Sequence, residues 1–299
     1  MKIKATQVVL DAVNKSNKLR PIKEQDAKKL KSVLAHAYFD IQQRCEANSI
    51  TTFLVYGSAL GAYRHHGFIP WDDDLDIAVS REDWEHLKEI FPSVFGDKYE
   101  LEGPNYQNKD SAATWGKIFL KNTRYVEIFN INTPYHKGIF IDVFIIDGVS
   151  DNCLIRKFES VIAQTMRFVA NSMAYYRYPS QTMDEVMSVL PETKNYLRFR
   201  KFIGFLFSCV SHKKWVSLYD YFISRHRQSK ETTMFFGESV VKRDYWLPVQ
   251  KIIFEGLEVN IPNHISTYLE ISYGSNYMEL PPVEKREQHF IVELDFGSY

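Results

Sequence analysis

The sequence predicts an α/β fold of the α+β type, in which a mixed sheet is flanked by helices and carries a helical subdomain. Two observations within the first 150 residues support this: amphipathic helical periodicity alternates with short apolar runs, and those runs are rich in β-branched and aromatic residues. A third observation is the change to long helical segments over residues 154–227, followed by a strand-like pattern at 251–261. We therefore expect segments from both ends of the chain to build one core.

A chain of 299 residues that is 45% hydrophobic can bury a sizeable core. We divide it into a core at residues 1–150, a helical insertion at 151–235, and a C-terminal hairpin and tail at 236–299 that complete the core. Lys+Arg and Asp+Glu are both 37, so a formal net charge of zero gives no support for a nucleic-acid partner. The three cysteines are far apart without a CxxC pair, which fits a reducing compartment and indicates neither a disulfide framework nor a zinc cluster.

The N-terminal elements follow from local patterns. Residues 23–45 are expected to form an amphipathic helix, because apolar residues recur there at three- and four-residue steps, and Asn48 is a plausible stop. The pattern then predicts strands at 50–56 and 75–79, with helices at 59–64 and 82–90. Gly67 and Pro70 mark the loop that leads into the second strand.

Three further strands are expected at 115–120, 124–129 and 138–147. The last is so strongly apolar that a central position in the sheet is favoured. Asp142 lies in the middle of it, and an unpaired carboxylate buried there would be costly. Residues 251–261 are expected to form a hairpin that turns at Glu255 and Gly256, followed by a short helix at 262–272.

Four carboxylates crowd into five positions, at Asp72, Asp73, Asp74 and Asp76. They repel one another unless a cation lies between them. Asp74 and Asp76 are two residues apart on the predicted strand and would share one of its faces, whereas Asp73 would point away and is expected to be structural. Mg²⁺ is the natural candidate for a shared cation, because it binds a few carboxylates and keeps positions for phosphate and water.

Asp142 comes from a separate strand and would converge on the same metal ions. Three carboxylates on two neighbouring strands are the layout of a two-metal phosphoryl-transfer site. Gly57 allows a close backbone approach, and the helix start after it presents N–H groups to a phosphate, with the Ser58 hydroxyl as a further donor. Lys117, on a predicted strand, is a candidate phosphate contact.

Simpler interpretations stand beside these. An Asp-rich loop is often a solvated turn or a surface calcium site, although the spacing lacks the Gly and Glu of an EF-hand. A lone Asp in a strand is often paired with an Arg, and Lys117 would then be a solvated edge lysine. His65 and His66 are adjacent and would point apart on a helix, which disfavours both as metal ligands. Residues 202–210 are too short to span a membrane, and form either a buried helix or a surface that touches a bilayer.

The run from Gly57 to Ile77 closely resembles the signature of the LicD family, which contains bacterial phosphocholine transferases and is related to the fukutin group. Residues 138–147 resemble the apolar, Asp-bearing strand of that family, and residues 254–282 resemble its C-terminal block. Ser58 and Tyr63 stand where the family pattern has Thr and Val. The tail at 273–278, Tyr-Gly-Ser-Asn-Tyr-Met, is one residue longer than the usual family sequence.

The resemblance implies a nucleotidyltransferase-like fold and a metal-dependent transferase. The enzyme would move a phospho-alcohol, such as phosphocholine, from a CDP-activated donor to a hydroxyl of a glycan or its lipid-linked precursor, releasing CMP. Lipopolysaccharide, capsule and teichoic acid are the acceptor classes it implies. We expect a cytoplasmic protein, with a peripheral contact at the inner face of the cell membrane as an alternative to full solubility.

The resemblance also implies roles by position. Asp74, Asp76 and Asp142 would be the catalytic carboxylates and the ligands of Mg²⁺, with Mn²⁺ as an alternative. The donor phosphates would be held by Gly57 and Ser58, and their charge would be offset by Arg64 and Lys117. Two other functions stay open: a nucleotidyltransferase that acts on a small molecule, and a catalytically silent glycan-binding protein of the same fold.

Overall fold

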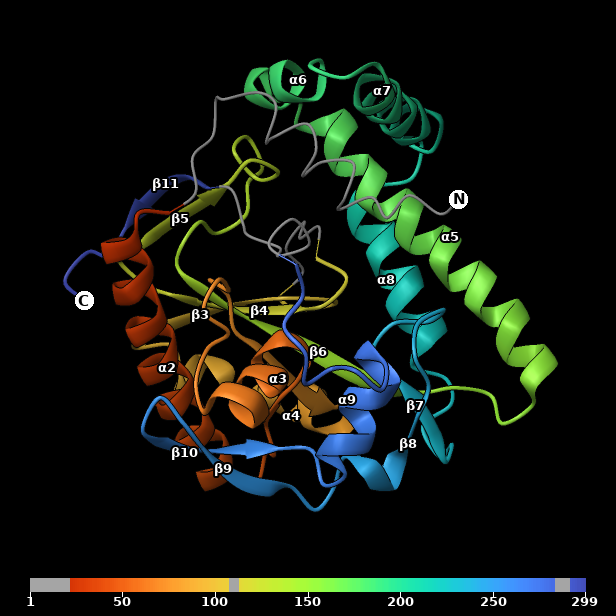
Figure 1. Cartoon of the computed structure of the whole chain (residues 1–299). Coiled ribbons are helices and arrows are strands. Elements are labelled where there is room, and N and C mark those ends of the chain that lie inside the picture. Colours follow the sequence, from red (N-terminus) through yellow and green to blue (C-terminus); the bar gives the residue numbers. More distant parts are fainter. Residues whose placement is uncertain (1–21, 108–112, 283–290) are drawn as a thin grey trace.

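The computed structural model describes residues 22–107, 113–282 and 291–299. Its centre is a seven-stranded sheet of order β1-β2-β6-β4-β3, with β7 pairing β6 and β8 pairing β7 (Figure 1). The strands are β1 (Phe53–Leu54), β2 (Asp76–Ser80), β3 (Tyr99–Glu102), β4 (Gly116–Leu120), β6 (Phe140–Gly148), β7 (Glu231–Thr233) and β8 (Val241–Lys242). Only the β2–β6 pair is parallel among these strands, so the predicted mixed α/β fold is confirmed.

The predicted central strand at 138–147 is confirmed as β6. Its first half lies between β2 and β4, and its last two residues pair with β7. Ile141, Val143 and Ile145 are all buried, which explains why the segment is so rich in β-branched residues. β6 therefore contacts β2, β4 and β7, and Asp142 and Val143 have a register partner on both sides.

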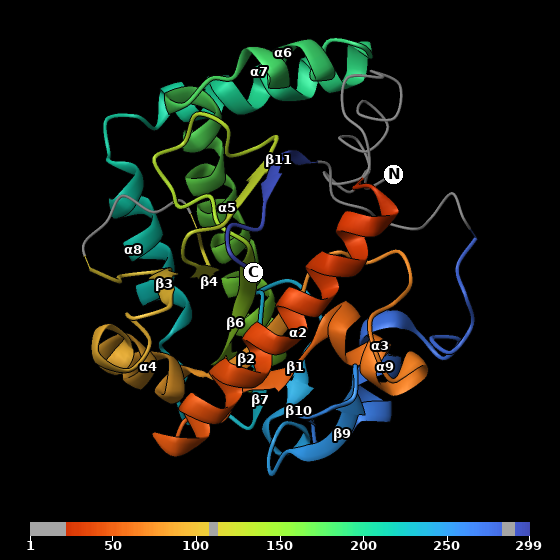
Figure 2. The same cartoon turned by 90° about the vertical axis from the view of Figure 1, so that its left-hand side faces the viewer.

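Both ends of the chain cover this sheet. The helices α2 (Glu24–Ala47), α3 (Tyr56–His65) and α4 (Arg81–Val94) come from the N-terminal part. The hairpin β9 (Gln250–Phe254) and β10 (Leu257–Ile261), the 3₁₀ helix η1 (Arg243–Tyr245) and the helix α9 (Ile265–Tyr273) come from the C-terminal part. β10 packs against β1 and α2, and α9 packs against α3, so residues far apart in sequence share one core (Figure 2).

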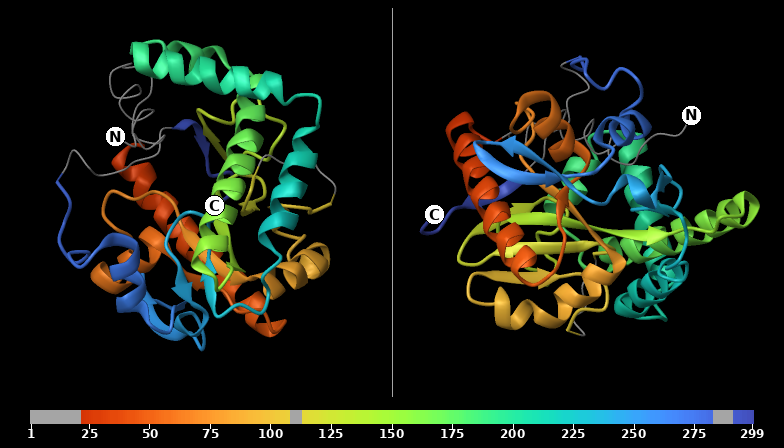
Figure 3. Two further views of the ribbon diagram at one scale, coloured as in Figure 1. Left: turned by 90° about the vertical axis from the view of Figure 1, so that its right-hand side faces the viewer. Right: turned by 90° about the horizontal axis from the view of Figure 1, so that it is seen from below.

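The residues after β6 form α5 (Cys153–Arg177), α6 (Gln181–Met187), α7 (Pro191–Leu206) and α8 (His212–Ile223). α5 is a long helix that packs against both α7 and α8, and its first turns project beyond the sheet (Figure 3). β7 lies within the predicted insertion at 151–235 but belongs to the main sheet. Of the helices in the described residues, none is long and apolar enough to cross a bilayer.

The predicted strand at 124–129 is shorter than expected and lies outside the main sheet. It is β5 (Arg124–Glu127), which pairs in antiparallel fashion with β11 (Ile291–Asp295) near the C-terminus. The sequence pattern predicts neither β3 nor β11. Both strands are short. The partner of β11 is β5, which is distant in sequence, and a loop separates β3 from its partner β4.

A buried ion network joins three elements of the fold. Arg81, at the start of α4, donates from Nε and Nη2 to the two carboxylate oxygens of Asp147 on β6, at 2.8 and 2.7 Å. Its Nη1 lies 2.8 Å from Oδ1 of Asp220 on α8, whose other oxygen accepts from Asn105. None of the three charged side chains is more than 6% exposed. The helical segment is thus anchored to the sheet by charges that have no access to water.

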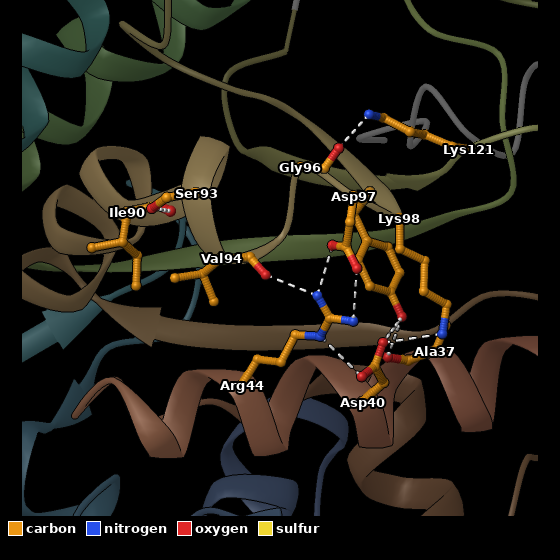
Figure 4. A network of polar contacts seen from close by, with 11 residues as sticks. Ala37, Asp40, Arg44, Ile90, Ser93, Val94, Gly96, Asp97, Lys98 and Lys121 are labelled. Carbon is orange, nitrogen blue, oxygen red and sulfur yellow. Dashed lines mark hydrogen bonds and ion pairs between the residues drawn. The ribbon is translucent and has the colours of Figure 1, made fainter.

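A second network fastens α2 to β3 (Figure 4). Asp40 accepts hydrogen bonds from the Tyr99 hydroxyl at 2.7 Å, from Lys98 Nζ at 3.0 Å and from Arg44 Nε at 3.0 Å. Arg44 also donates to Asp97 Oδ1 at 2.7 Å. Partial burial on its own would raise the pKa of Asp40, but the hydrogen bonds outweigh burial and lower the pKa below its ordinary value.

We expect Asp40→Asn to weaken folding at neutral pH by about 1–2 kcal/mol, because it removes a charge that accepts three hydrogen bonds. A carboxylate with a lowered folded-state pKa stabilises above its unfolded pKa, and that contribution disappears as the pH falls through the folded-state pKa. The difference between wild type and variant should therefore shrink below about pH 4. Urea unfolding of both proteins from pH 7 to pH 3 measures it, and a difference that stays constant with pH would contradict the assignment.

Candidate active site

Four charged residues form a row across one face of the central sheet. Along β2, β6, β4 and β3, the register places Asp76 opposite Asp142, Asp142 opposite Lys117, and Lys117 opposite Glu102. Residues directly opposite in neighbouring strands point to the same face. The structure therefore brings together three of the predicted site residues, and it adds Glu102, which sequence reasoning missed because it assigned no strand there.

Asp142 has two polar partners within this row. Lys117 Nζ lies 3.0 Å from Asp142 Oδ1, and Trp115 Nε1 donates a hydrogen bond to the same oxygen at 2.6 Å. Burial on its own would lower the pKa of Lys117, but the negative charges of Asp142 and its neighbours raise it above the ordinary value. Lys117 is 17% exposed at its side chain and lies on an inner strand, so it is not a solvated edge lysine. The buried strand carboxylate is thus held as an ion pair.

Asp76 begins β2 and is fixed through its backbone. Its N–H donates to Ser58 Oγ at 2.9 Å, and its carbonyl accepts from Val55 N–H at 3.0 Å. Ser58 is 5% exposed in the first turn of α3, so its hydroxyl holds the start of the strand. A Cβ on Gly57 would lie 2.9 Å from Asp72 Oδ2, so glycine leaves this carboxylate room beside the start of α3. Phosphate binding by these two residues stays a prediction.

The carboxylates before β2 lie in irregular backbone. β2 begins at Asp76, so Asp74 precedes the strand, and the expectation that both lie on one strand face is wrong. The ladder of β2 with β6 begins at the pair Asp76–Asp142, and the Asp142 N–H donates to the Leu75 carbonyl at 3.0 Å. Asp73 is buried, and Asp73, Asp74 and Asp142 all add to the raised pKa of Tyr125, after burial as the main cause. These carboxylates therefore lie within electrostatic reach of the Tyr125 hydroxyl, although Asp74 is not on the strand.

Two cations border this region. Lys31 on α2 donates from Nζ to the carbonyls of Ile69 and Pro70, at 3.1 and 2.9 Å, and holds the loop that leads to the carboxylates. Arg64, near the end of α3, donates from Nη1 to the Tyr277 carbonyl at 2.7 Å. Burial lowers the pKa of Arg64, and the charge of Asp72 opposes that shift. Arg64 thus ties the C-terminal tail to the predicted site, while Lys31 was not foreseen.

An aromatic cluster adjoins the charged row. The Phe144 ring centroid lies 4.9 Å from Tyr56, 6.3 Å from Trp115 and 5.5 Å from Phe235. Arg167 on α5 places its guanidinium 4.2 Å from the Phe235 ring centroid. Trp115 belongs to both groups, because its indole N–H bonds Asp142. The sequence pattern did not place any of these rings at the site.

The side-chain oxygens at this site fit the ligand preference of Mg²⁺ in part. Asp76 and Asp142 offer hard carboxylate oxygens from one face of two adjacent strands. Mg²⁺ commonly uses one or two carboxylates and completes its shell with water and substrate phosphates. Among residues 22–107, 113–282 and 291–299, no three His, Cys, Asp or Glu side chains gather as a metal-ligand group. Asp74 as a third ligand, and the metal itself, stay predictions.

The mixed sheet aligns two carboxylates and a lysine close to the Gly57-Ser58 start of α3. Residues 49–167 match the family described as LicD/FKTN/FKRP, nucleotidyltransferase domain. The chain therefore carries a LicD-family domain, and the resemblance noted in its sequence is confirmed.

Similar proteins extend this finding beyond the domain. The chain is 26% identical over 257 residues to the lipopolysaccharide cholinephosphotransferase LicD of Haemophilus influenzae, across 83% of this chain and 90% of that protein. A 53-residue stretch is 45% identical to the uncharacterized protein RP689 of Rickettsia prowazekii and 43% identical to RT0683 of Rickettsia typhi. These shorter matches cover 18% of this chain, and 20% and 17% of the two proteins.

Proposed function

We propose that this protein is a transferase that moves phosphocholine onto a hydroxyl of a lipopolysaccharide or a related glycan. The observation that carries the proposal is the likeness to a lipopolysaccharide cholinephosphotransferase over 83% of the chain. The aligned pair Asp76 and Asp142, with Lys117 beside it, supports the proposal, because it supplies charges suited to phosphoryl transfer. A CDP-activated donor is the class of substrate that such a site would use.

The proposed reaction exchanges one oxygen for another on phosphorus. The glycan hydroxyl attacks the choline-bearing phosphorus of CDP-choline, the bond from that phosphorus to the bridging oxygen breaks, and CMP leaves. A carboxylate of the Asp76–Asp142 pair accepts the proton of the attacking hydroxyl. Lys117 remains charged beside this pair and attracts the phosphate oxygens. Mg²⁺ or Mn²⁺ bound at the same carboxylates would neutralise further charge on the diphosphate.

The aromatic cluster suggests where the choline group binds. A quaternary ammonium is attracted to the faces of Trp and Tyr rings, and Trp115 and Tyr56 are both only partly buried. The Tyr56 hydroxyl also donates to Glu238 Oε2 at 3.3 Å, and the charge of Glu238 is partly offset by Arg167, whose Nη2 lies 3.8 Å from Glu238 Oε1. An alcohol without a positive charge would gain less from this arrangement, so we propose that the site prefers choline.

Labelled donors test the proposal. Wild-type protein is incubated with Mg²⁺, a lipopolysaccharide acceptor and CDP-choline that is labelled either in choline or in cytidine, and CMP is quantified. The proposal requires choline label in the acceptor and CMP in equal amount. Cytidine label in the acceptor would show a nucleotidyltransferase instead. Acceptor binding by calorimetry, with neither label transferred for any CDP-alcohol supplied, would show a silent glycan-binding protein.

A further inference from the structure

The helix α7 is apolar on two opposite sides. Its inner side packs on α5 and includes buried Leu197 and Gly204. Its outer side carries four large apolar side chains, each between 51% and 58% exposed: Phe199, Phe202, Phe205 and Leu206. Large apolar side chains on a helix of a globular protein normally face the core. In α7 the outer side is instead open over the described structure.

Two side chains of the open face pack against α5. Phe199 lies against Phe168 of α5 with ring centroids 6.0 Å apart, and Phe205 lies against Tyr176 of α5 at 5.7 Å. Below α7, the Arg200 guanidinium lies 4.3 Å from the Phe168 ring centroid. Two of the rings thus pack on α5, and we call the four exposed side chains the α7 face (Phe199, Phe202, Phe205 and Leu206).

The charges near the α7 face are mostly basic, with exposed Glu192 in the first turn of α7 and Asp184 of α6 as acidic exceptions. Between Glu192 and Asp220 the sequence contains no Asp or Glu, and its basic residues are Lys194, Arg198, Arg200, Lys201, Lys213 and Lys214. Lys194, Arg198 and Lys214 are exposed, whereas Lys201 pairs with Asp184 of α6. A partner that covers this face must therefore be apolar at its centre and negative at its rim.

We propose that the α7 face docks this protein onto the surface of a membrane that contains anionic lipids. A helix with aromatic and leucine side chains on one face and basic residues beside them lies flat at the lipid interface, with its apolar side chains among the acyl chains. The basic residues gain from the negative surface potential of such a membrane. α7 lies at the outer end of the molecule, opposite the β9–β10 hairpin, so docking would leave the sheet accessible (Figure 1).

Vesicle binding tests this docking without any donor or acceptor, so its result is independent of the proposed transfer reaction. Full-length protein is sedimented with vesicles of phosphatidylcholine alone or mixed with phosphatidylglycerol. We expect binding to the mixed vesicles, and a partition coefficient at least about tenfold lower for the double variant Phe202→Ser, Phe205→Ser. The double variant Lys194→Gln, Arg198→Gln should bind several-fold more weakly and lose much of the salt dependence.

The matched control is Ile253→Ser, which removes a 52% exposed apolar side chain from β9 at the other end of the molecule. It should bind as the wild type does. Circular dichroism confirms that each variant is folded. The docking proposal is overturned if folded wild-type protein does not sediment with mixed vesicles, or if Ile253→Ser lowers binding as much as the α7 variants. A wild-type dimer in sedimentation equilibrium that Phe202→Ser and Phe205→Ser dissociate would also overturn it, because a second copy would then cover this face.

Discussion

Replacing Asp142 by Asn is expected to lower the turnover number about 10³-fold, the size of effect seen when a major charge-stabilising group is removed from an active site. The variant loses the charge that faces Asp76 across the parallel strand pair and that balances Lys117. The amide accepts a proton poorly and binds a hard cation weakly. The loss should appear in kcat when CDP-choline, acceptor and Mg²⁺ are saturating.

Asp76→Asn is the companion experiment, because it leaves the ion pair of Lys117 and Asp142 in place. A similar loss in that variant separates the chemistry from any structural effect of an unpaired lysine. The matched control is Asp244→Asn, which neutralises an exposed carboxylate on η1 away from the charged row. Thermal unfolding shows whether each variant is folded. Turnover of folded Asp142→Asn within about tenfold of wild type would remove Asp142 from the catalytic group.

The sequence was informative about this site where the pattern is local. The apolar run around Asp142 predicts a central strand, and the strand-like run after the Asp cluster predicts β2. The sequence pattern does not show which residues of β2, β4 and β6 lie opposite one another, because this register is set by contacts between distant segments. Lys117 was therefore a candidate, but its position opposite Asp142 could not be derived. The strand is predicted at 75–79 and β2 runs from Asp76 to Ser80, so Asp74 lies outside it and does not share a strand face with Asp76.

Side-chain partners were harder still to foresee. Ser58 is predicted to contact a phosphate, and its hydroxyl oxygen also accepts from the Asp76 N–H. Arg64 donates to the carbonyls of Tyr277 and Glu279, more than 200 residues away. Trp115 has no motif of its own, and its bond to Asp142 depends on the β4–β6 pairing. Each of these contacts joins segments that approach one another only in the finished fold, so no periodicity or spacing signals them.

The ion network of Arg81, Asp147 and Asp220 also joins segments that are distant in sequence, and the second prediction concerns it. Arg81→Met should lower the free energy of unfolding by about 3–5 kcal/mol, because it leaves Asp147 and Asp220 buried without their cation. Methionine keeps most of the side-chain volume, so the loss reflects charge rather than a cavity. Burial already raises the pKa of Asp147 to about 6, and without Arg81 it should rise further, so that the variant regains part of its stability as the pH falls.

Urea unfolding at pH 7.5 and at pH 5.5 measures both effects. The matched control is Arg124→Met, whose partner Glu293 is about half exposed, and which should cost at most about 1 kcal/mol at either pH. A second variant, Arg81→Met with Asp147→Asn, should be more stable at pH 7.5 than Arg81→Met alone, because it removes one of the two stranded charges. If Arg81→Met costs no more than Arg124→Met, water reaches these carboxylates and the network does not anchor α8 to β6. A double variant weaker than the single one would show that Asp147 stabilises the fold through its hydrogen bonds rather than through its charge.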